Sequence, residues 1–208
     1  MNIQHQKINR RFFLIALRDK VIDANFFQHR PFMNNAVKEL EINLVPLNLV
    51  SLSTLGFSSK SLKVNEVPQN ATVTIANDVI NNDRGLRLLA SNGLIKLKEN
   101  TKEFVTQRDI AENPKNLRIK EVEGVQVVRA INDVDFIVSS AQIVALAGIT
   151  PQFMGQETAK DKKYALAFVT LQGRENEPKI HKLNKLLNDP QVRDFINKQY
   201  QGRIVPVF

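Results

Sequence analysis

The sequence predicts an α/β protein of one or two domains. Short apolar segments with strand-like composition alternate with segments of helical period, an order typical of sheets whose parallel strands are connected by helices. The 208 residues are 43% hydrophobic and 24% charged, with 8 Gly and 8 Pro, which is the balance of a soluble globular chain. The length is sufficient to bury a substantial core.

The first half contains three predicted helices and two β-rich regions. In order, these are a helix over residues 9–20, an apolar stretch over 21–27, a helix over 34–40, a β-rich segment over 44–59, a strand over 71–78 and a helix over 81–97. Pro46 interrupts the start of the β-rich segment. Asn82 and Asp83 are suitable caps for the last helix, and Gly93 is a suitable stop.

The second half continues the alternation. It comprises a helical turn over 108–113, a strand over 116–124, a helix over 124–132, a buried strand over 134–140, a helix over 142–147, a strand over 164–171 and helices over 178–188 and 190–200. Asp189 followed by Pro190 is a good start signal, because it places a capping residue before a first-turn proline.

The amino terminus has features of an export signal, with Lys7, Arg10 and Arg11 preceding an apolar run over 12–17. That run is short and ends in charged residues instead of a small-residue cleavage site. We therefore favour an amphipathic helix whose apolar residues Phe13, Leu14 and Leu17 face a core.

Composition and motifs exclude several classes of chemistry. The chain has no cysteine and only three histidines, which excludes thiolate chemistry and argues against a metal site. It contains no P-loop, dinucleotide-binding fingerprint or nucleophile elbow. We expect no enzyme, no cofactor and no metal. The net charge of +8 comes from dispersed Lys and Arg interleaved with acidic residues, so we expect a solvated surface and no nucleic-acid partner.

The segment IDANFFQHRPF (22–32) is the first candidate binding site. In an extended chain Phe27 and His29 project to the same face, and an aromatic face beside an imidazole suits a small apolar or thioether group. The alternative is that Phe26 and Phe27 fill a core while His29 caps a loop.

Two further candidates follow predicted strands. In TIANDVINNDRG (74–85) the strand ends at Asn77 and leads into a helix with Arg84 near its first turn. A guanidinium beside a helix amino terminus can receive a carboxylate; the alternative is a surface arginine beside Asp83. In DFIVSSAQ (135–142), Ser140 and Gln142 either bind a ligand or cap the next helix.

These segments, in this order, resemble the methionine-binding lipoproteins of bacterial ABC importers, the NlpA lipoprotein family. The resemblance rests on IDANFFQHRPF, on STLGFSSKSLKVNEVPQNATVTIANDVINNDRGLRLLASNGLIKLKEN, on DIAENPKNLRIKEVEGVQVVRAINDVDFIV and on the ending DPQVRDFINKQYQGRIVPVF. It extends from about residue 14 to residue 208.

The resemblance implies a two-lobed periplasmic-binding-protein-like α/β fold of type II. Lobe one would comprise residues 1–58 and 166–208, and lobe two residues 59–165. Family members begin with a signal peptide, a lipid-anchor cysteine and a further strand and helix, so lobe one is expected to be incomplete in this sequence. The family works at the periplasmic face of the inner membrane, whereas a chain without signal peptide or lipobox cysteine would stay in the cytoplasm.

The resemblance also implies a function. The chain would bind methionine or a related amino acid between its lobes and deliver it to a membrane permease. Arg84 would hold the carboxylate, and the other expected ligand contacts are Phe27, His29, Phe32, Asn77, Ser140 and Gln142.

Some positions depart from the family pattern. Arg10 stands where the family has an aromatic contact, SSAQ (139–142) replaces an asparagine-containing loop, and Leu166 replaces an asparagine. Each lost hydrogen bond to a charged ligand group would cost about 1.5–3 kcal/mol. The alternative function is therefore a truncated, degenerate paralogue with altered or lost ligand binding.

Overall fold

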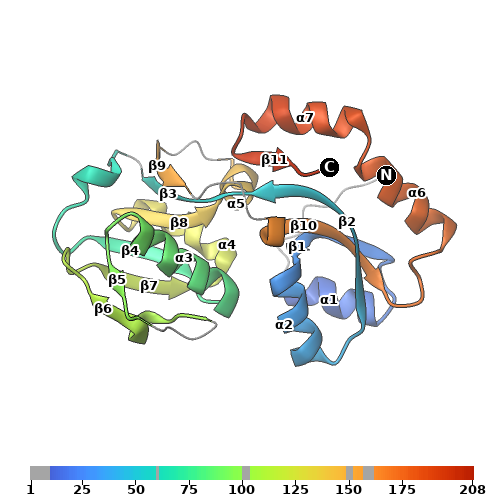
Figure 1. Ribbon diagram of the computed structural model, residues 1–208, viewed down its shortest axis with the longest axis horizontal. Coiled ribbons are helices and arrows are strands. Elements are labelled where there is room, and N and C mark those ends of the chain that lie inside the picture. Colours follow the sequence, from blue (N-terminus) through green and yellow to red (C-terminus); the bar gives the residue numbers. More distant parts are fainter. Residues whose placement is uncertain (1–9, 60, 100–103, 149–151, 157–161) are drawn as a thin grey trace. The chain divides into compact units, whose positions relative to one another are not determined.

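The computed structural model describes residues 10–59, 61–99, 104–148, 152–156 and 162–208 (Figure 1). The chain divides into two compact units: unit 1 comprises Met1–Leu52 and Asp161–Phe208, and unit 2 comprises Ser53–Lys160. Both boundaries fall a few residues before those expected from the sequence. The chain therefore passes from unit 1 into unit 2 at Ser53 and returns at Asp161.

Unit 1 is built on a four-stranded sheet with the order β1-β10-β2-β11. Its strands are β1 (Ala24–His29), β2 (Leu44–Ser53), β10 (Ala165–Leu171) and β11 (Ile204–Pro206), and its helices are α1 (Arg10–Arg18), α2 (Arg30–Leu40), η4 (Lys162–Tyr164), α6 (Pro178–Leu187) and α7 (Pro190–Tyr200). The expectation of parallel strands is wrong here, because β10 runs antiparallel to both β1 and β2. β10 follows the return of the chain from unit 2, so it joins the sheet without the helical crossover that connects parallel strands.

Helices α1 and α2 supply much of the core of unit 1. Leu14 and Leu17 of α1 are buried, while Phe12 is 52% exposed, so the amphipathic helix predicted for this segment is confirmed from Arg10 onward. Of the predicted basic stretch, Lys7 lies outside the described residues, whereas Arg10 and Arg11 belong to α1. Met33 of α2 packs against Ala167 and Val169 of β10.

Unit 2 is built on a five-stranded sheet with the order β7-β4-β8-β3-β9. Its strands are β3 (Leu55–Ser59), β4 (Thr72–Ala76), β7 (Arg118–Val122), β8 (Phe136–Ser140) and β9 (Gln152–Gln156), with a small separate sheet of β5 (Lys96–Leu97) and β6 (Ile110–Glu112). β4 pairs in parallel with β7 and β8, as predicted for these segments. β3 is antiparallel to β8 and β9.

The helical segments of unit 2 are η1 (Val64–Glu66), α3 (Val79–Ser91), η2 (Gln107–Asp109), α4 (Gly124–Val127), η3 (Val128–Asn132) and α5 (Ala141–Leu146). Four of them contribute to two hydrophobic clusters. α3 contributes Leu86 and Leu89 to a cluster around Phe57 and Phe136. α4, η3 and α5 contribute to a second cluster that contains Ile137.

Several local predictions need correction. The helical turn expected over 108–113 is wrong beyond residue 109, because residues 110–112 form β6, where Glu112 pairs with Lys96 of β5. The preceding helix ends at Ser91, and Gly93 adopts a left-handed φ of 71°. The cap of this helix is Asp78, which accepts a hydrogen bond from the Asn81 amide, and not Asn82 or Asp83.

Asp135 ties the amino ends of β4 and β8 together. Its carboxylate accepts hydrogen bonds from the Thr72 amide at 2.6 Å and from the Thr72 hydroxyl at 2.7 Å. Its own carbonyl accepts a hydrogen bond from the Ser59 hydroxyl at 2.8 Å. The bonds from Thr72 hold the pKa of the Asp135 carboxyl below its ordinary value, since they stabilise the ionised form.

We predict that Asp135→Asn lowers the free energy of unfolding by about 1–2 kcal/mol at neutral pH, because a partly exposed charge-assisted pair is lost. A carboxyl group whose pKa is lowered by folding stabilises the fold at pH values above its unfolded-state pKa. This contribution is lost as the pH falls through its folded-state pKa. The difference in the free energy of unfolding between variant and parent should therefore shrink below about pH 4. Urea titrations at pH 7 and pH 3.5 measure it, and an equal difference at both pH values would contradict the assignment.

We also predict that Gly85→Ala stabilises unit 2. Gly85 lies inside α3, and a Cβ there would meet Ile75 and Val138 side-chain atoms at 3.7 Å, which is ordinary van der Waals contact. Replacing a mid-helix glycine with alanine should raise the free energy of unfolding by about 0.5–1 kcal/mol. The control is Gly93→Ala, which should destabilise because of the positive φ. Denaturant unfolding followed by circular dichroism tests both, and a destabilised Gly85→Ala would overturn the packing described.

Candidate functional site

Two of the predicted site segments, 74–85 and 135–142, meet at one edge of the unit 2 sheet. β4 and β8 run in parallel, so their carboxyl ends lie at the same edge, and β3 begins there because Leu55 pairs with Ser140. We call this the carboxyl edge. It receives Asn77 after β4, Ser140 and Gln142 at the end of β8, and Ser53 just before β3. Ligands of α/β sheets commonly bind at such edges.

Arg84 is anchored at the carboxyl edge. It is 5% exposed, and its Nη2 donates a hydrogen bond to the Ser53 carbonyl at 2.9 Å. It lies in the second turn of α3, because the helix begins at Val79 and not at residue 81. The alternative of a surface arginine paired with Asp83 is wrong, since Asp83 instead accepts hydrogen bonds from Arg87 and from the Val105 amide.

Two hydrogen bonds hold the β4–α3 turn. The Asn77 backbone amide donates to the Val122 carbonyl at 2.8 Å, which ties the turn to the end of β7, and the Asn77 residue is exposed. The buried Asn82 side chain donates to the Ala76 carbonyl at 3.0 Å. The Asn82 bond fastens the first turn of α3, which precedes Arg84, to the end of β4.

Ser140 and Gln142 have structural partners of their own. The Ser140 hydroxyl accepts a hydrogen bond from the Ile143 amide at 3.4 Å and is the cap of α5. The backbone amide of Gln142 donates to the Ser53 hydroxyl at 2.9 Å. Of the two alternatives for Ser140, helix capping is therefore the role its contacts support. The half-buried side chain of Gln142 stays a predicted ligand contact.

The remaining predicted site residues gather in unit 1 as an aromatic cluster. The Phe27 and Phe32 rings meet edge to face with centroids 6.1 Å apart, and the His29 ring meets Phe32 at 6.2 Å and Tyr164 at 5.4 Å. Phe27 also contacts Phe13 and packs against a hydrophobic cluster. Phe27 thus helps to fill the core of unit 1, as the alternative interpretation of this segment proposed.

His29 caps α2. Its Nδ1 accepts a hydrogen bond from the Phe32 amide at 3.1 Å, and Pro31 follows in the first turn. This cap explains why α2 begins at Arg30 and not at residue 34. A neutral imidazole that accepts at Nδ1 carries its proton on Nε2, so the ring presents a donor on its other side.

Sequence reasoning missed two residues of this arrangement. Ser53 has no local signal, because its importance comes from contacts with Arg84 and Gln142, which are far away in the sequence. Tyr164 lies at the end of η4, and its ring contact with His29 depends on the pairing of β1 with β10.

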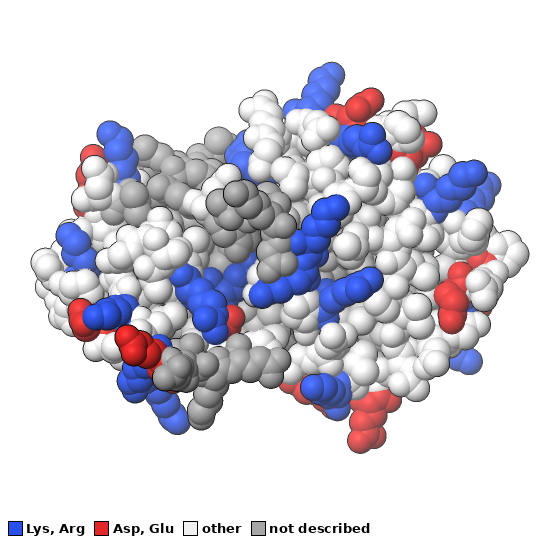
Figure 2. Space-filling view, viewed as in Figure 1, with Lys and Arg blue, Asp and Glu red and all other residues white. Residues whose placement is uncertain are grey.

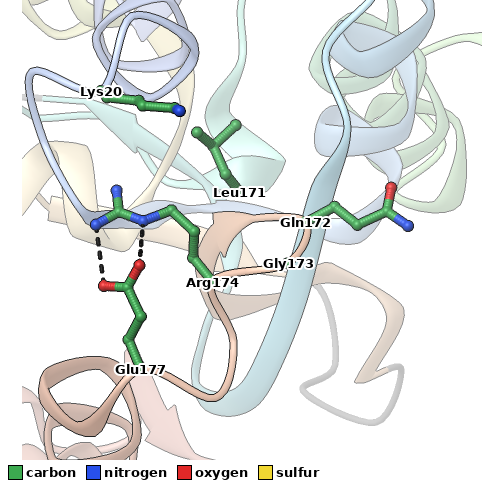
Figure 3. A pocket seen from close by; sticks show the side chains of 6 residues that line it. All are labelled: Lys20, Leu171, Gln172, Gly173, Arg174 and Glu177. Atoms are coloured by element: carbon green, nitrogen blue, oxygen red, sulfur yellow. Dashed lines mark hydrogen bonds and ion pairs between the residues drawn. The ribbon is translucent and has the colours of Figure 1, made fainter.

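A cavity of about 360 Å³ in unit 1 lies away from all predicted site residues. Figure 3 shows the Arg174 guanidinium facing the Glu177 carboxylate, with Lys20 nearby. Arg174 is bonded to Glu177 and to Asp23, each at 2.6 Å. The Arg174 bond lowers the pKa of Glu177, and bonds from Lys179 and Arg174 lower that of Asp23. Arg174 is thereby paired with two carboxylates, which indicates a structural role for this cluster of charges.

The surface shows dispersed charge. On the face in Figure 2, basic side chains occur over both units with acidic side chains among them. No helix in the described ranges has the length and apolar character needed to cross a membrane. Within those same ranges, no cluster of His, Asp and Glu is suited to holding a metal ion.

Comparison with known proteins agrees with this architecture. A structure of a nutrient binding protein from Burkholderia cenocepacia bound to methionine has a TM-score of 0.87 and 33% identity, covering all of this chain and 86% of that one. A methionine-binding lipoprotein, MetQ, from Bacillus subtilis is 33% identical over 92% of this chain and 73% of its own length. The D-methionine-binding lipoprotein MetQ of Salmonella typhi is 32% identical over 91% of this chain and 72% of its own length.

Two α/β units connected by two chain crossings, with this degree of structural similarity, define a periplasmic-type substrate-binding protein. The model of the NlpA lipoprotein family matches residues 14–208. The chain therefore belongs to the NlpA lipoprotein family, as its sequence motifs indicated.

We predict that the two roles of His29 can be separated. His29→Ala should lower the free energy of unfolding by about 1 kcal/mol through loss of the α2 cap, whereas His29→Asn should retain most of that stability because asparagine is a strong cap. Thermal melts measure both. If His29 also contacts a ligand, His29→Asn will fold normally and bind more weakly; equal stability of the two variants would contradict the capping role.

Proposed function

We propose that this chain is the solute-binding component of an ABC importer for methionine or a related amino acid. The ligand would lie between the two units and be delivered to a membrane permease. The protein would act by binding alone, without catalysis, at the periplasmic side of the inner membrane. Membership of the NlpA family and the methionine-bound relative support this proposal.

The observation that carries the proposal is the buried Arg84 guanidinium at the carboxyl edge. A planar guanidinium can bind a carboxylate through two parallel hydrogen bonds. Because Arg84 is already oriented by the Ser53 carbonyl, little side-chain entropy would be lost on binding. Asn77 and Gln142 lie at the same edge and would contribute polar contacts to the amino acid.

The aromatic cluster of unit 1 would receive the ligand side chain. A thioether makes favourable contacts with aromatic rings, and Phe27, Phe32 and His29 present three rings in edge-to-face contact. This division of labour, with charge recognised by unit 2 and shape by unit 1, is what closure of two lobes on one ligand requires.

Thermal melts with and without millimolar L-methionine test the proposal. A ligand that binds only the native state stabilises it by about 2.7 kcal/mol at one hundred times its dissociation constant, so the midpoint should rise. The transition must be followed by dye or dichroism because the chain has no Trp. A cooperative transition that ignores methionine and related amino acids would favour the alternative, a paralogue with altered or lost binding in which Leu166 and SSAQ (139–142) reduce the polar contacts.

Substitution at the proposed carboxylate contact gives a sharper prediction. Arg84→Lys should weaken methionine binding about 10- to 100-fold, because a lysine cannot reproduce the bidentate pair. The matched control is Arg87→Lys, one turn further along α3, where the side chain is 45% exposed and binding should be unchanged. Titration calorimetry measures both affinities. Equal affinity of Arg84→Lys and the parent would remove Arg84 from the site.

A further inference from the structure

The segment Ser53–Thr54 occupies a special place in the chain. It is where the polypeptide leaves unit 1 and enters unit 2, and it connects β2 to β3. Both residues are buried, with exposed fractions of 4% and 1%.

Ser53 is bonded to two of the predicted ligand residues at once. Its carbonyl accepts a hydrogen bond from Arg84 Nη2 at 2.9 Å, and its hydroxyl accepts one from the backbone amide of Gln142 at 2.9 Å. Arg84 comes from α3 and Gln142 from α5. A single residue of the crossing segment therefore connects the two elements that carry the polar part of the proposed site.

Thr54 extends this connection along α5. The Ala141 amide donates to the Thr54 carbonyl at 2.9 Å, and the Ile143 amide donates to the Ser140 hydroxyl. The first three amides of α5 are therefore all engaged, two of them by the crossing segment. The start of α5 is held by the crossing segment, and its amides are not the groups that would receive a ligand anion.

We propose that Ser53 is a positioning residue that holds Arg84 and the start of α5 in the arrangement that binds the ligand. This inference rests on the proposed function. The carbonyl of Ser53 orients the Arg84 guanidinium, and its hydroxyl holds the Gln142 backbone amide. A shift of the backbone at Ser53 would move both groups together, and a carboxylate bound to Arg84 favours the backbone conformation that orients the guanidinium best.

The test compares Ser53→Ala with Ser51→Ala. Ser53→Ala removes the hydroxyl and keeps the carbonyl. Ser51 lies two residues earlier in β2 and is equally buried at 5%, and no described residue is hydrogen-bonded to its hydroxyl, which makes it a matched control. Ser53→Cys, a close isostere with a weak acceptor, is the second variant if Ser53→Ala does not fold.

Two measurements are made on each folded variant: affinity for L-methionine, and hydrogen exchange of the α5 backbone amides without ligand. Ser53→Ala should bind about 3- to 10-fold more weakly, as expected for loss of one hydrogen bond. Its Gln142 backbone amide should exchange faster. Ser51→Ala should match the parent in both measurements.

The outcomes separate the two proposals. If Ser53→Ala binds methionine as tightly as the parent, the positioning role is wrong. If the parent itself binds no methionine or related amino acid, the proposed function fails. The exchange measurement needs no ligand and still tests the positioning of α5: an unchanged Gln142 amide would overturn it, and faster exchange confined to α5 would support it.

Discussion

The hydrogen bond between the Arg84 guanidinium and the Ser53 carbonyl is the interaction on which the arrangement of the unit 2 site depends. An arginine that is 95% buried must have its charge compensated by polar partners, and here a backbone carbonyl of the crossing segment provides one at 2.9 Å. The bond exists only because β3 is antiparallel to β8, which brings the residues before β3 to the edge where β4 and β8 end. Strand direction therefore decides where the guanidinium is held.

The two units contribute different kinds of group. Unit 2 presents amides, hydroxyls and one guanidinium at the ends of its strands, whereas unit 1 presents aromatic rings that also belong to its own packing. His29 belongs to two sets of contacts, because its Nδ1 caps α2 while its ring packs against Phe32 and Tyr164. Residues such as Phe27 support the fold in the absence of any ligand, so their identity alone does not distinguish core from site.

Much of the fold could be predicted because helical period and apolar strands are local properties. The helices near 10–18, 178–187 and 190–200, and the strands near 72–76, 118–122, 136–140 and 165–171, all follow from them. The strands β5, β6 and β11 contain only two or three residues, and they and β9 exist through pairing with other segments, so local patterns do not predict them. The cap of α3 was misplaced because Asp78, Asn81, Asn82 and Asp83 all have capping side chains, and only packing selects among them. Arg84, Asn77 and Gln142 could be nominated from strand ends, whereas Ser53 could not, since its contacts join positions 53, 84 and 142.

The central claim, that Arg84 recognises a carboxylate, is tested most directly by comparing L-methionine with L-methioninol, which keeps the side chain and ammonium but replaces the carboxylate with an alcohol. Titration calorimetry on the unmodified chain should detect methionine binding and a loss of at least about tenfold in affinity for methioninol, because the charge-assisted pair is absent. Equal affinity for the two compounds would contradict the account, since it would mean that recognition does not involve the carboxylate.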